Sequence, residues 1–136
     1  MADLIFWSEK YNLGVEVIDT QHKKMIEIIN VLYRSLQASP DKEVLRSTIQ
    51  ELIRYADMHF ATEEKYFNEF EYAGREEHIR EHEAYREKIS KFSKAYYEDE
   101  VMLPFEMMDF LGEWWVRHIL GEDREYVDCF HQNGLR

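Results

Sequence analysis

The fold is indicated most clearly by residues 45–67, which read LRSTIQELIRYADMHFATEEKYF. Positions three or four apart in such a stretch share one face of a helix, and here most of them are apolar. That face comprises Leu45, Ile49, Leu52, Ala56, His59, Glu63 and Phe67. The stretch therefore predicts one long amphipathic helix whose buried face ends in a polar pair, His59 and Glu63.

Three further stretches show apolar residues at the same spacing, and only five glycines and two prolines interrupt the chain. The four predicted helices span approximately residues 19–37, 41–70, 75–97 and 104–120. Asp19 is expected to be the N-cap of the first helix, and Pro104 suits the first turn of the fourth. Short connections between four helices favour an antiparallel up-down-up-down bundle, so the sequence predicts an all-α fold.

The two ends of the chain are expected to be less regular. Residues 1–18 show no sustained helical period but are rich in apolar side chains, so we expect an irregular N-terminal arm that packs across the bundle. The tail from Glu122 is expected to form one short helix through Tyr126 and Phe130. A chain of 136 residues has the usual size of one domain, so residues 1–136 are expected to form a single unit.

Composition argues against several classes of function. The formal net charge of -11 repels the phosphates of nucleic acids and anionic lipid surfaces, so no nucleic acid partner is expected. Cys129 is the only cysteine, which excludes an intrachain disulfide, and we expect it to behave as a small buried apolar residue. The sequence shows neither an export signal nor an apolar stretch long enough for a membrane span, which favours a cytoplasmic location.

Polar residues on the four apolar faces are expected to converge at one end of the bundle. In an antiparallel bundle the starts of the first and third helices meet the ends of the second and fourth. These positions hold His22, His59, Glu63, His78, His82 and His118. Burying so many ionisable groups without a partner is costly, so a shared cation explains them better than separate hydrogen-bonded core histidines do. His131 lies in the polar tail and is expected to be exposed.

Asp123 follows His118 by five residues, a spacing that turns a side chain about 140° away on a regular α-helix. Spacing alone leaves two alternatives: Asp123 points away, or a break or wider turn at Gly121 returns it to the cluster. The other ligands are nitrogen and oxygen atoms with no thiolate, and they exceed what one tetrahedral ion uses. Two ions are implied, and iron suits this ligand set, as do manganese or a mixed pair.

The spaced motifs resemble those of the hemerythrins, closely the bacterial single-domain kind. The pattern is a lone histidine at the end of Asp19-Thr20-Gln21-His22, then HxxxE in residues 59–63, HxxxH in residues 78–82 and HxxxxD in residues 118–123. The resemblance implies a non-haem di-iron centre with an oxo or hydroxo bridge. The implied ligands are His78, His82 and His118 for one iron, His22 and His59 for the other, and Glu63 and Asp123 for both.

The resemblance also implies reversible O2 binding at an open position on the second iron, where small anions such as azide also bind. The implied O2 pocket consists of Trp7, Phe60, Trp115 and Ile119. Oxygen-activating di-iron enzymes in bundles use more carboxylates, so this imidazole-rich set favours a carrier that is not an enzyme. Such a carrier stores O2 or delivers it to an O2-using enzyme; the alternatives are a di-iron enzyme acting on nitric oxide or peroxide, and an O2 or redox sensor.

Two residues beside the expected ligands have open roles. Trp115 stands three residues before His118, near where the family more often has a leucine. Its indole narrows the pocket or donates a hydrogen bond toward Glu63 or the bound ligand; the alternative is that it turns along the bundle into the layer of Leu111. Gln21 either orients a ligand imidazole or lies on the surface.

Overall fold

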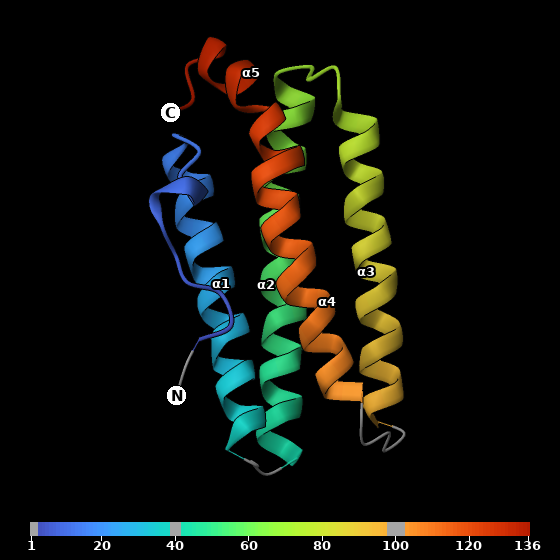
Figure 1. The fold of residues 1–136 in the computed structure, drawn as a ribbon. Helices are drawn as coiled ribbons and strands as arrows, with labels where there is room; N and C mark the ends of the chain where they lie inside the picture. The colour runs from blue at the N-terminus through green and yellow to red at the C-terminus, as the bar shows by residue number, and fades with distance from the viewer. Residues whose placement is uncertain (1–2, 39–41, 98–102) are drawn as a thin grey trace.

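The computed structural model describes residues 3–38, 42–97 and 103–136, and its regular structure is helical. The long helices are α1 (Glu16–Gln37), α2 (Lys42–Glu69), α3 (Arg75–Tyr97) and α4 (Leu103–His118). They run alternately down and up beside one another (Figure 1). The predicted all-α, antiparallel four-helix bundle is therefore confirmed. The shorter elements are the 3-10 turn η1 (Glu9–Tyr11), the π-helix η2 (Ile119–Asp123) and α5 (Val127–Gln132).

Helix α1 begins three residues earlier than the sequence predicted. Its N-cap is Val15, and Asp19 lies inside the first turn. The Asp19 carboxylate does accept backbone hydrogen bonds, but they come from Leu13 N at 2.8 Å and Gly14 N at 3.1 Å, before the helix. Asp19 thus stabilises the loop that enters α1. The predicted turn at residues 39–41 lies outside the described residues.

The apolar faces of the four long helices meet along the axis of the bundle. Many core side chains are completely buried, among them Ile18, Met25, Ile29, Leu52, Phe60, Phe67, Leu111 and Trp115. Burying one such side chain stabilises a fold by about 1.5–3 kcal/mol, so this core holds the helices in register. The register matters for function because it fixes which residues meet at each end.

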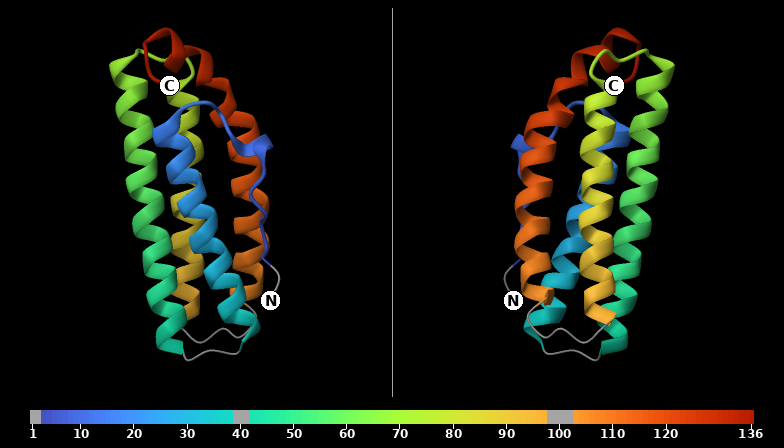
Figure 2. Two further views of the ribbon diagram at one scale, coloured as in Figure 1. Left: turned by 90° about the vertical axis from the view of Figure 1, so that its left-hand side faces the viewer. Right: turned by 90° about the vertical axis from the view of Figure 1, so that its right-hand side faces the viewer.

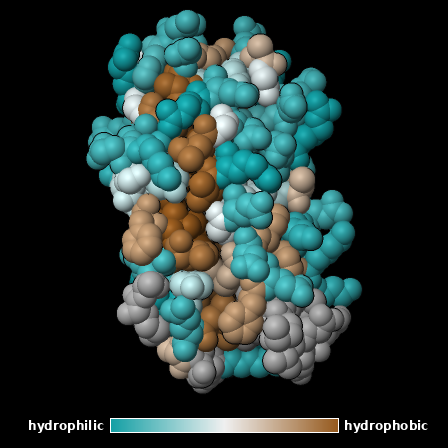
Figure 3. All heavy atoms as spheres, in the orientation of Figure 1, coloured by the Kyte–Doolittle hydropathy of each residue, from teal (hydrophilic) through white to brown (hydrophobic). Residues whose placement is uncertain are grey.

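The N-terminal arm lies between α1 and α4, as Figure 2 shows from the side. Asn30 of α1 anchors the arm, because its Oδ1 accepts from Leu4 N and Ile5 N at 3.0 Å and its Nδ2 donates to Ile5 O at 2.8 Å. On the other side, a Cβ at Gly112 would lie 3.2 Å from Leu4, so glycine lets the arm approach α4 closely. An apolar strip follows this face of the molecule (Figure 3).

The tail folds over the end of the bundle where α2 meets α3 (Figure 1). The predicted short helix is present as α5, and it buries Phe130 beside the equally buried Tyr126. The rings of Tyr126 and Phe130 stack with centroids 4.2 Å apart, and Phe67 of α2 packs against both. Within residues 3–38, 42–97 and 103–136, no helix has the length and apolarity needed to cross a membrane.

Candidate metal centre

The polar residues predicted to converge do so at the end of the bundle that the tail covers. His22 comes from the start of α1, His59 and Glu63 from the second half of α2, and the others from α3, α4 and η2. The structure brings together all seven candidates: His22, His59, Glu63, His78, His82, His118 and Asp123. Each is buried, with at most 3% of its surface exposed. Seven ionisable side chains therefore share one dry interior.

Asp123 stands at the centre of this group. Its Oδ1 lies 3.0 Å from Nε2 of His78 and 3.0 Å from Nε2 of His118. Its Oδ2 lies 2.9 Å from Nε2 of His22. The two carboxylate oxygens thus face different histidines, which is the arrangement a bridging carboxylate needs.

The turn that places Asp123 is a π-helix. In η2 the helix pairs each residue with the one five positions along, so residues five apart stand on one face. This geometry decides between the two alternatives that spacing left open, because it returns Asp123 to the side of His118. Gly121, at the middle of the turn, is exposed, and a Cβ there would meet nothing within 4 Å.

Glu63 occupies the corresponding place on α2. Its Oε1 lies 3.3 Å from His59 Nε2 and 3.2 Å from His82 Nε2. Its Oε2 accepts a hydrogen bond of 2.6 Å from the hydroxyl of Tyr126. The carboxylate is therefore oriented by the tail of the chain and shared between histidines from two helices.

The unsatisfied atoms of the site fit bound metal. The Nε2 atoms of all five histidines, Glu63 Oε1 and both oxygens of Asp123 are buried without a hydrogen-bond partner. Two atoms that bind one ion at about 2.1 Å and at right angles stand about 3 Å apart, which matches the separations above. Orphaned polar atoms are rare in protein interiors, so a cation that accepts all these lone pairs accounts for them.

The candidate ligands divide into two overlapping clusters. Within each cluster the ligand atoms lie within 4.8 Å of one another. One cluster is Glu63, His78, His82 and His118, and the other is His22, His59, Glu63 and Asp123. Glu63 belongs to both, and Asp123 also reaches His78 and His118 of the first cluster.

Two ligand imidazoles are oriented by side chains behind them. His59 Nδ1 lies 2.7 Å from Oε1 of Gln21, whose amide nitrogen donates to Thr62 at 3.2 Å. His82 Nδ1 lies 2.8 Å from Oε2 of Glu64. Such partners fix the ring so that Nε2 faces the metal. The role of Gln21 as a partner of a ligand imidazole is thus the one its geometry supports.

Burial and neighbouring charges set the protonation of the cluster without metal. Burial lowers the pKa of His59 to about 4, so this imidazole is neutral. Burial also opposes the charged form of His82, but the adjacent carboxylates of Glu63 and Glu64 outweigh it and raise the pKa to about 9. Likewise, the imidazoles around Asp123, foremost His118, outweigh burial and hold its pKa well below the usual value. Burial and Asp123 oppose the charged form of Glu63 as well, but His59 and His82 outweigh them and lower its pKa. The carboxylates of Glu63 and Asp123 are therefore both available as anionic ligands.

Three of the four residues expected in the O2 pocket are completely buried: Phe60, Trp115 and Ile119. Phe60 lies between His82 and Trp115, stacked on both, with ring centroids at 3.9 Å and 5.6 Å. The ring centroid of Trp115 also lies 6.0 Å from that of His59. Trp7 is only partly buried, and its ring contacts Tyr11 and Lys23. Among the ring contacts of the described residues, Trp7 meets neither Phe60 nor Trp115.

The hydrogen bond of Trp115 differs from the predicted one. Its indole N–H donates to the hydroxyl of Tyr85 at 3.0 Å, and Tyr126 is the residue that donates to Glu63. A buried indole needs a hydrogen-bond acceptor, and the Tyr85 hydroxyl supplies it. Neither tyrosine stands out in the sequence, because an aromatic residue on an apolar face is indistinguishable from an ordinary core residue.

Two further predictions concern the tail. His131 is partly buried instead of exposed, and its Nε2 lies 2.8 Å from the carbonyl oxygen of Gly14. It therefore joins the tail to the loop before α1 and stands apart from the clusters. Cys129 is partly buried and packs against the hydrophobic core.

This arrangement defines a cation-binding four-helix bundle. The family model described as the hemerythrin HHE cation binding domain matches residues 13–130. The chain belongs to the hemerythrin family. A bacteriohemerythrin of Clostridium acetobutylicum is 35% identical over 129 residues, covering 92% of this chain and 100% of the relative. A bacteriohemerythrin of Stenotrophomonas maltophilia is 31% identical over 125 residues, covering 92% of this chain and 80% of the relative.

Solved structures agree with this assignment. A wild-type hemerythrin crystal structure superposes with a TM-score of 0.86 at 26% identity, covering 93% of this chain and 97% of that one. A hemerythrin variant with a leucine-to-tyrosine substitution superposes with a TM-score of 0.87 at 26% identity, covering 94% and 98%. The similarity therefore extends over nearly the whole bundle, including the end that holds the clusters.

Proposed function

We propose that this chain binds O2 reversibly at two iron ions and so stores O2 or delivers it to an O2-using enzyme. The observation that carries the proposal is the pair of buried clusters that share Glu63 and are joined again by Asp123. When bound, iron supplies the redox chemistry that O2 binding requires. The names of the curated relatives, bacteriohemerythrins, support the same class of function.

The two clusters suggest how the ligands are divided. His78, His82 and His118 would hold one ion, and His22 and His59 would hold the other. Glu63 and Asp123 would contact both. The second ion then has one protein ligand fewer, so an exogenous ligand such as O2 or azide would bind on the side of His59.

The side chains around His59 suit a small apolar ligand. Phe60 and Trp115 pack against His59 and are completely buried, so they exclude water from this side of the cluster. A dry surrounding limits access of protons and water to the bound gas, and neutral imidazoles favour the ferrous state over more oxidised ones. These side chains favour release of unchanged O2 over its reduction.

The rival function is a di-iron enzyme that consumes nitric oxide or peroxide at the same residues. The two are separated by reducing the iron-loaded protein without air, exposing it to O2 and then degassing it, while absorption is recorded. A carrier gives a visible band that appears with O2 and disappears on degassing over repeated cycles. A band that decays without returning, together with many turnovers of nitric oxide or peroxide, would establish the enzyme instead.

A matched pair of variants ties this behaviour to the proposed ligands. Glu63→Ala removes the side chain that both clusters share, whereas His131→Ala removes a histidine of the tail. We expect Glu63→Ala to retain much less iron and to lose the band. If the two variants kept equal iron, the ligand assignment would be wrong.

A further inference from the structure

The two clusters differ in the charge of the side chains that lie behind their imidazoles. A histidine of each cluster has its Nδ1 hydrogen-bonded: His82 in the first cluster and His59 in the second. The partner of His82 is the carboxylate of Glu64, at 2.8 Å. The partner of His59 is the amide oxygen of Gln21, at 2.7 Å. The two contacts are alike in length, but only the first brings a negative charge.

The uncharged partner is held in place by its own hydrogen bonds. The hydroxyl of Thr62 donates to the carbonyl oxygen of Met58 at 3.1 Å, so its oxygen is free to accept from Nε2 of Gln21 at 3.2 Å. The amide of Gln21 is thereby oriented with its oxygen toward His59. The imidazole of His59 donates its Nδ1 hydrogen to a neutral group and presents Nε2 to the cluster.

The neighbouring imidazoles extend the difference. In the first cluster, Nδ1 of His118 lies 3.8 Å from Oε2 of Glu122. In the second cluster, Nδ1 of His22 is buried and has no hydrogen-bond partner among the described residues. Asp19 precedes His22 by three residues, but its two oxygens accept from backbone N–H groups of the loop before α1. Carboxylates therefore lie behind the first cluster, whereas an uncharged amide lies behind the second.

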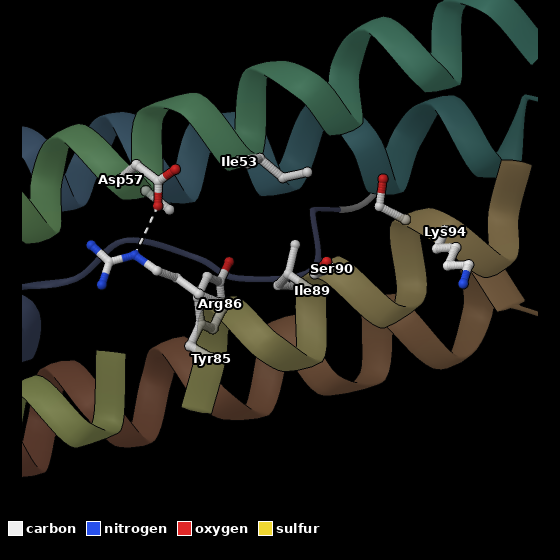
Figure 4. Close-up of a pocket in the computed structure, with 9 residues that line it drawn as sticks. Ile53, Asp57, Tyr85, Arg86, Ile89, Ser90 and Lys94 are labelled. Atoms are coloured by element: carbon white, nitrogen blue, oxygen red, sulfur yellow. Dashed lines mark hydrogen bonds and ion pairs between the residues drawn. The ribbon is translucent and has the colours of Figure 1, made fainter. Parts of the chain in front are cut away.

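The charge of Glu64 is only partly offset by the nearest cation. Nη2 of Arg86 lies 3.7 Å from Oε2 of Glu64, farther than the contacts of Arg86 with Asp57 at 3.0 Å and Glu83 at 2.8 Å. Figure 4 shows the guanidinium group of Arg86 bound to Asp57 across the space between α2 and α3. One cation shared among three carboxylates leaves a net negative charge, so Glu64 still acts on His82.

A charge behind a ligand imidazole changes how strongly its Nε2 donates to a metal. A carboxylate that accepts the Nδ1 hydrogen raises the basicity of the imidazole. Negative charge near an ion stabilises a trivalent ion more than a divalent one, because the Coulomb energy grows with the charge of the ion. The surroundings of His82 therefore favour ferric iron more strongly than the surroundings of His59 do.

We propose that Glu64 and Gln21 give the two iron positions unequal reduction potentials, with the lower potential at the ion held by His82. This inference rests on the proposed function and deepens it. The open position proposed for O2 lies on the side of His59. An ion without an open position takes part in O2 binding only by giving up its electron, and a lower potential favours that. Glu64 and Gln21 are thus positioning residues that act through the imidazoles.

The test is a potentiometric titration of the iron-loaded protein without air, followed by absorption, with mediators that exchange one electron at a time. Each step transfers one electron from the iron pair to the mediator, and two separate potentials are expected. Glu64→Gln keeps an oxygen for His82 but removes the charge. It should raise the lower potential by about 59 mV, which corresponds to a tenfold change in the preference for ferric iron. Gln21→Glu makes the opposite change behind His59 and should lower the higher potential by a similar amount.

Two control variants change the charge of the same helices at exposed positions, Glu69→Gln on α2 and Thr20→Glu on α1. They should leave the separation of the two potentials unchanged, whereas Glu64→Gln and Gln21→Glu should each narrow it. The inference is overturned if the separation stays constant in both test variants, or if the controls narrow it as much. If Glu64→Gln loses its iron, the result for Gln21→Glu decides.

Iron content measured on the same samples keeps this inference apart from the proposed function. Two irons per chain with a separation that no variant alters would refute only the inference. Unaltered protein that holds no pair of irons would refute both.

Discussion

Tyr126 donates its hydroxyl proton to Oε2 of Glu63 across 2.6 Å, inside a region where neither side chain is exposed. Burial and the nearby carboxylates raise the pKa of Tyr126 well above its ordinary value, so the phenol stays protonated and keeps donating. The bond joins the tail of the chain to the carboxylate that both clusters share. The covering over this end of the bundle is thus also part of the support for the metal ligands.

Replacing this tyrosine should therefore destabilise the metal-free protein. Tyr126→Phe leaves one oxygen of a buried carboxylate without its hydrogen bond, which we expect to cost about 1.5–3 kcal/mol. Urea unfolding of the metal-free variant measures this loss. Tyr66→Phe changes a partly buried ring near Phe130 and serves as the control. Equal unfolding free energies for the two variants would show that the Tyr126 bond has no special role.

Glu64 should matter for iron affinity although it does not face the metal. Its carboxylate holds Nδ1 of His82, and losing such a partner typically lowers metal affinity about 10- to 100-fold. We expect Glu64→Gln to weaken iron binding by at least the lower figure, measured by competition with a chelator. Glu69→Gln, an exposed residue of the same helix, should match the unaltered protein. An unchanged affinity in Glu64→Gln would refute the proposed role.

The π-helix geometry of η2 predicts opposite effects on iron binding for a deletion and an insertion at Gly121. Removing Gly121 places Asp123 four residues after His118, and on a regular α-helix residues four apart share a face. The deletion variant should therefore still bind iron. Inserting an alanine after Gly121 turns Asp123 by about another 100° and should abolish tight binding. Iron analysis after gel filtration checks both, and loss of iron in the deletion variant alone would contradict this interpretation of η2.

Trp115 should control access to the side of His59. Its ring is held between Phe60 and the Tyr85 hydroxyl, so it cannot easily swing away. We expect Trp115→Leu to speed binding of azide to the oxidised protein while iron content stays the same. Trp7→Leu, which alters a ring lying against Tyr11 and Lys23, should not change the rate. Stopped-flow rates that are equal for both variants would remove Trp115 from the proposed pocket.

Much of the fold follows from local pattern. Apolar residues at helical spacing in α2 and its partners predict the bundle, and the antiparallel order then predicts which ends meet. His59 and Glu63 are found together because four residues of α-helix place them on one face. The helix boundaries were less predictable, as Asp19 shows. Aspartate is a residue type typical of N-caps, and the sequence alone does not show that the backbone groups it binds lie before the helix.

The surroundings of the candidate ligands were harder to predict because they depend on contacts between distant segments. Tyr126 reaches Glu63 across 63 positions of sequence, and Trp115 reaches Tyr85 across 30. Neither residue differs in its local pattern from ordinary core. Asp123 lies between these cases, since its spacing from His118 signalled an irregular turn but did not say which kind.

We propose that the seven buried side chains hold two iron ions that bind O2 and release it unchanged. This proposal is tested most directly by measuring iron per chain and O2 uptake on the same anaerobically reduced sample, then the O2 recovered under vacuum. We expect two irons and one O2 per chain, with nearly all of the O2 returned. One zinc per chain, or O2 that is consumed and not recovered, would contradict it.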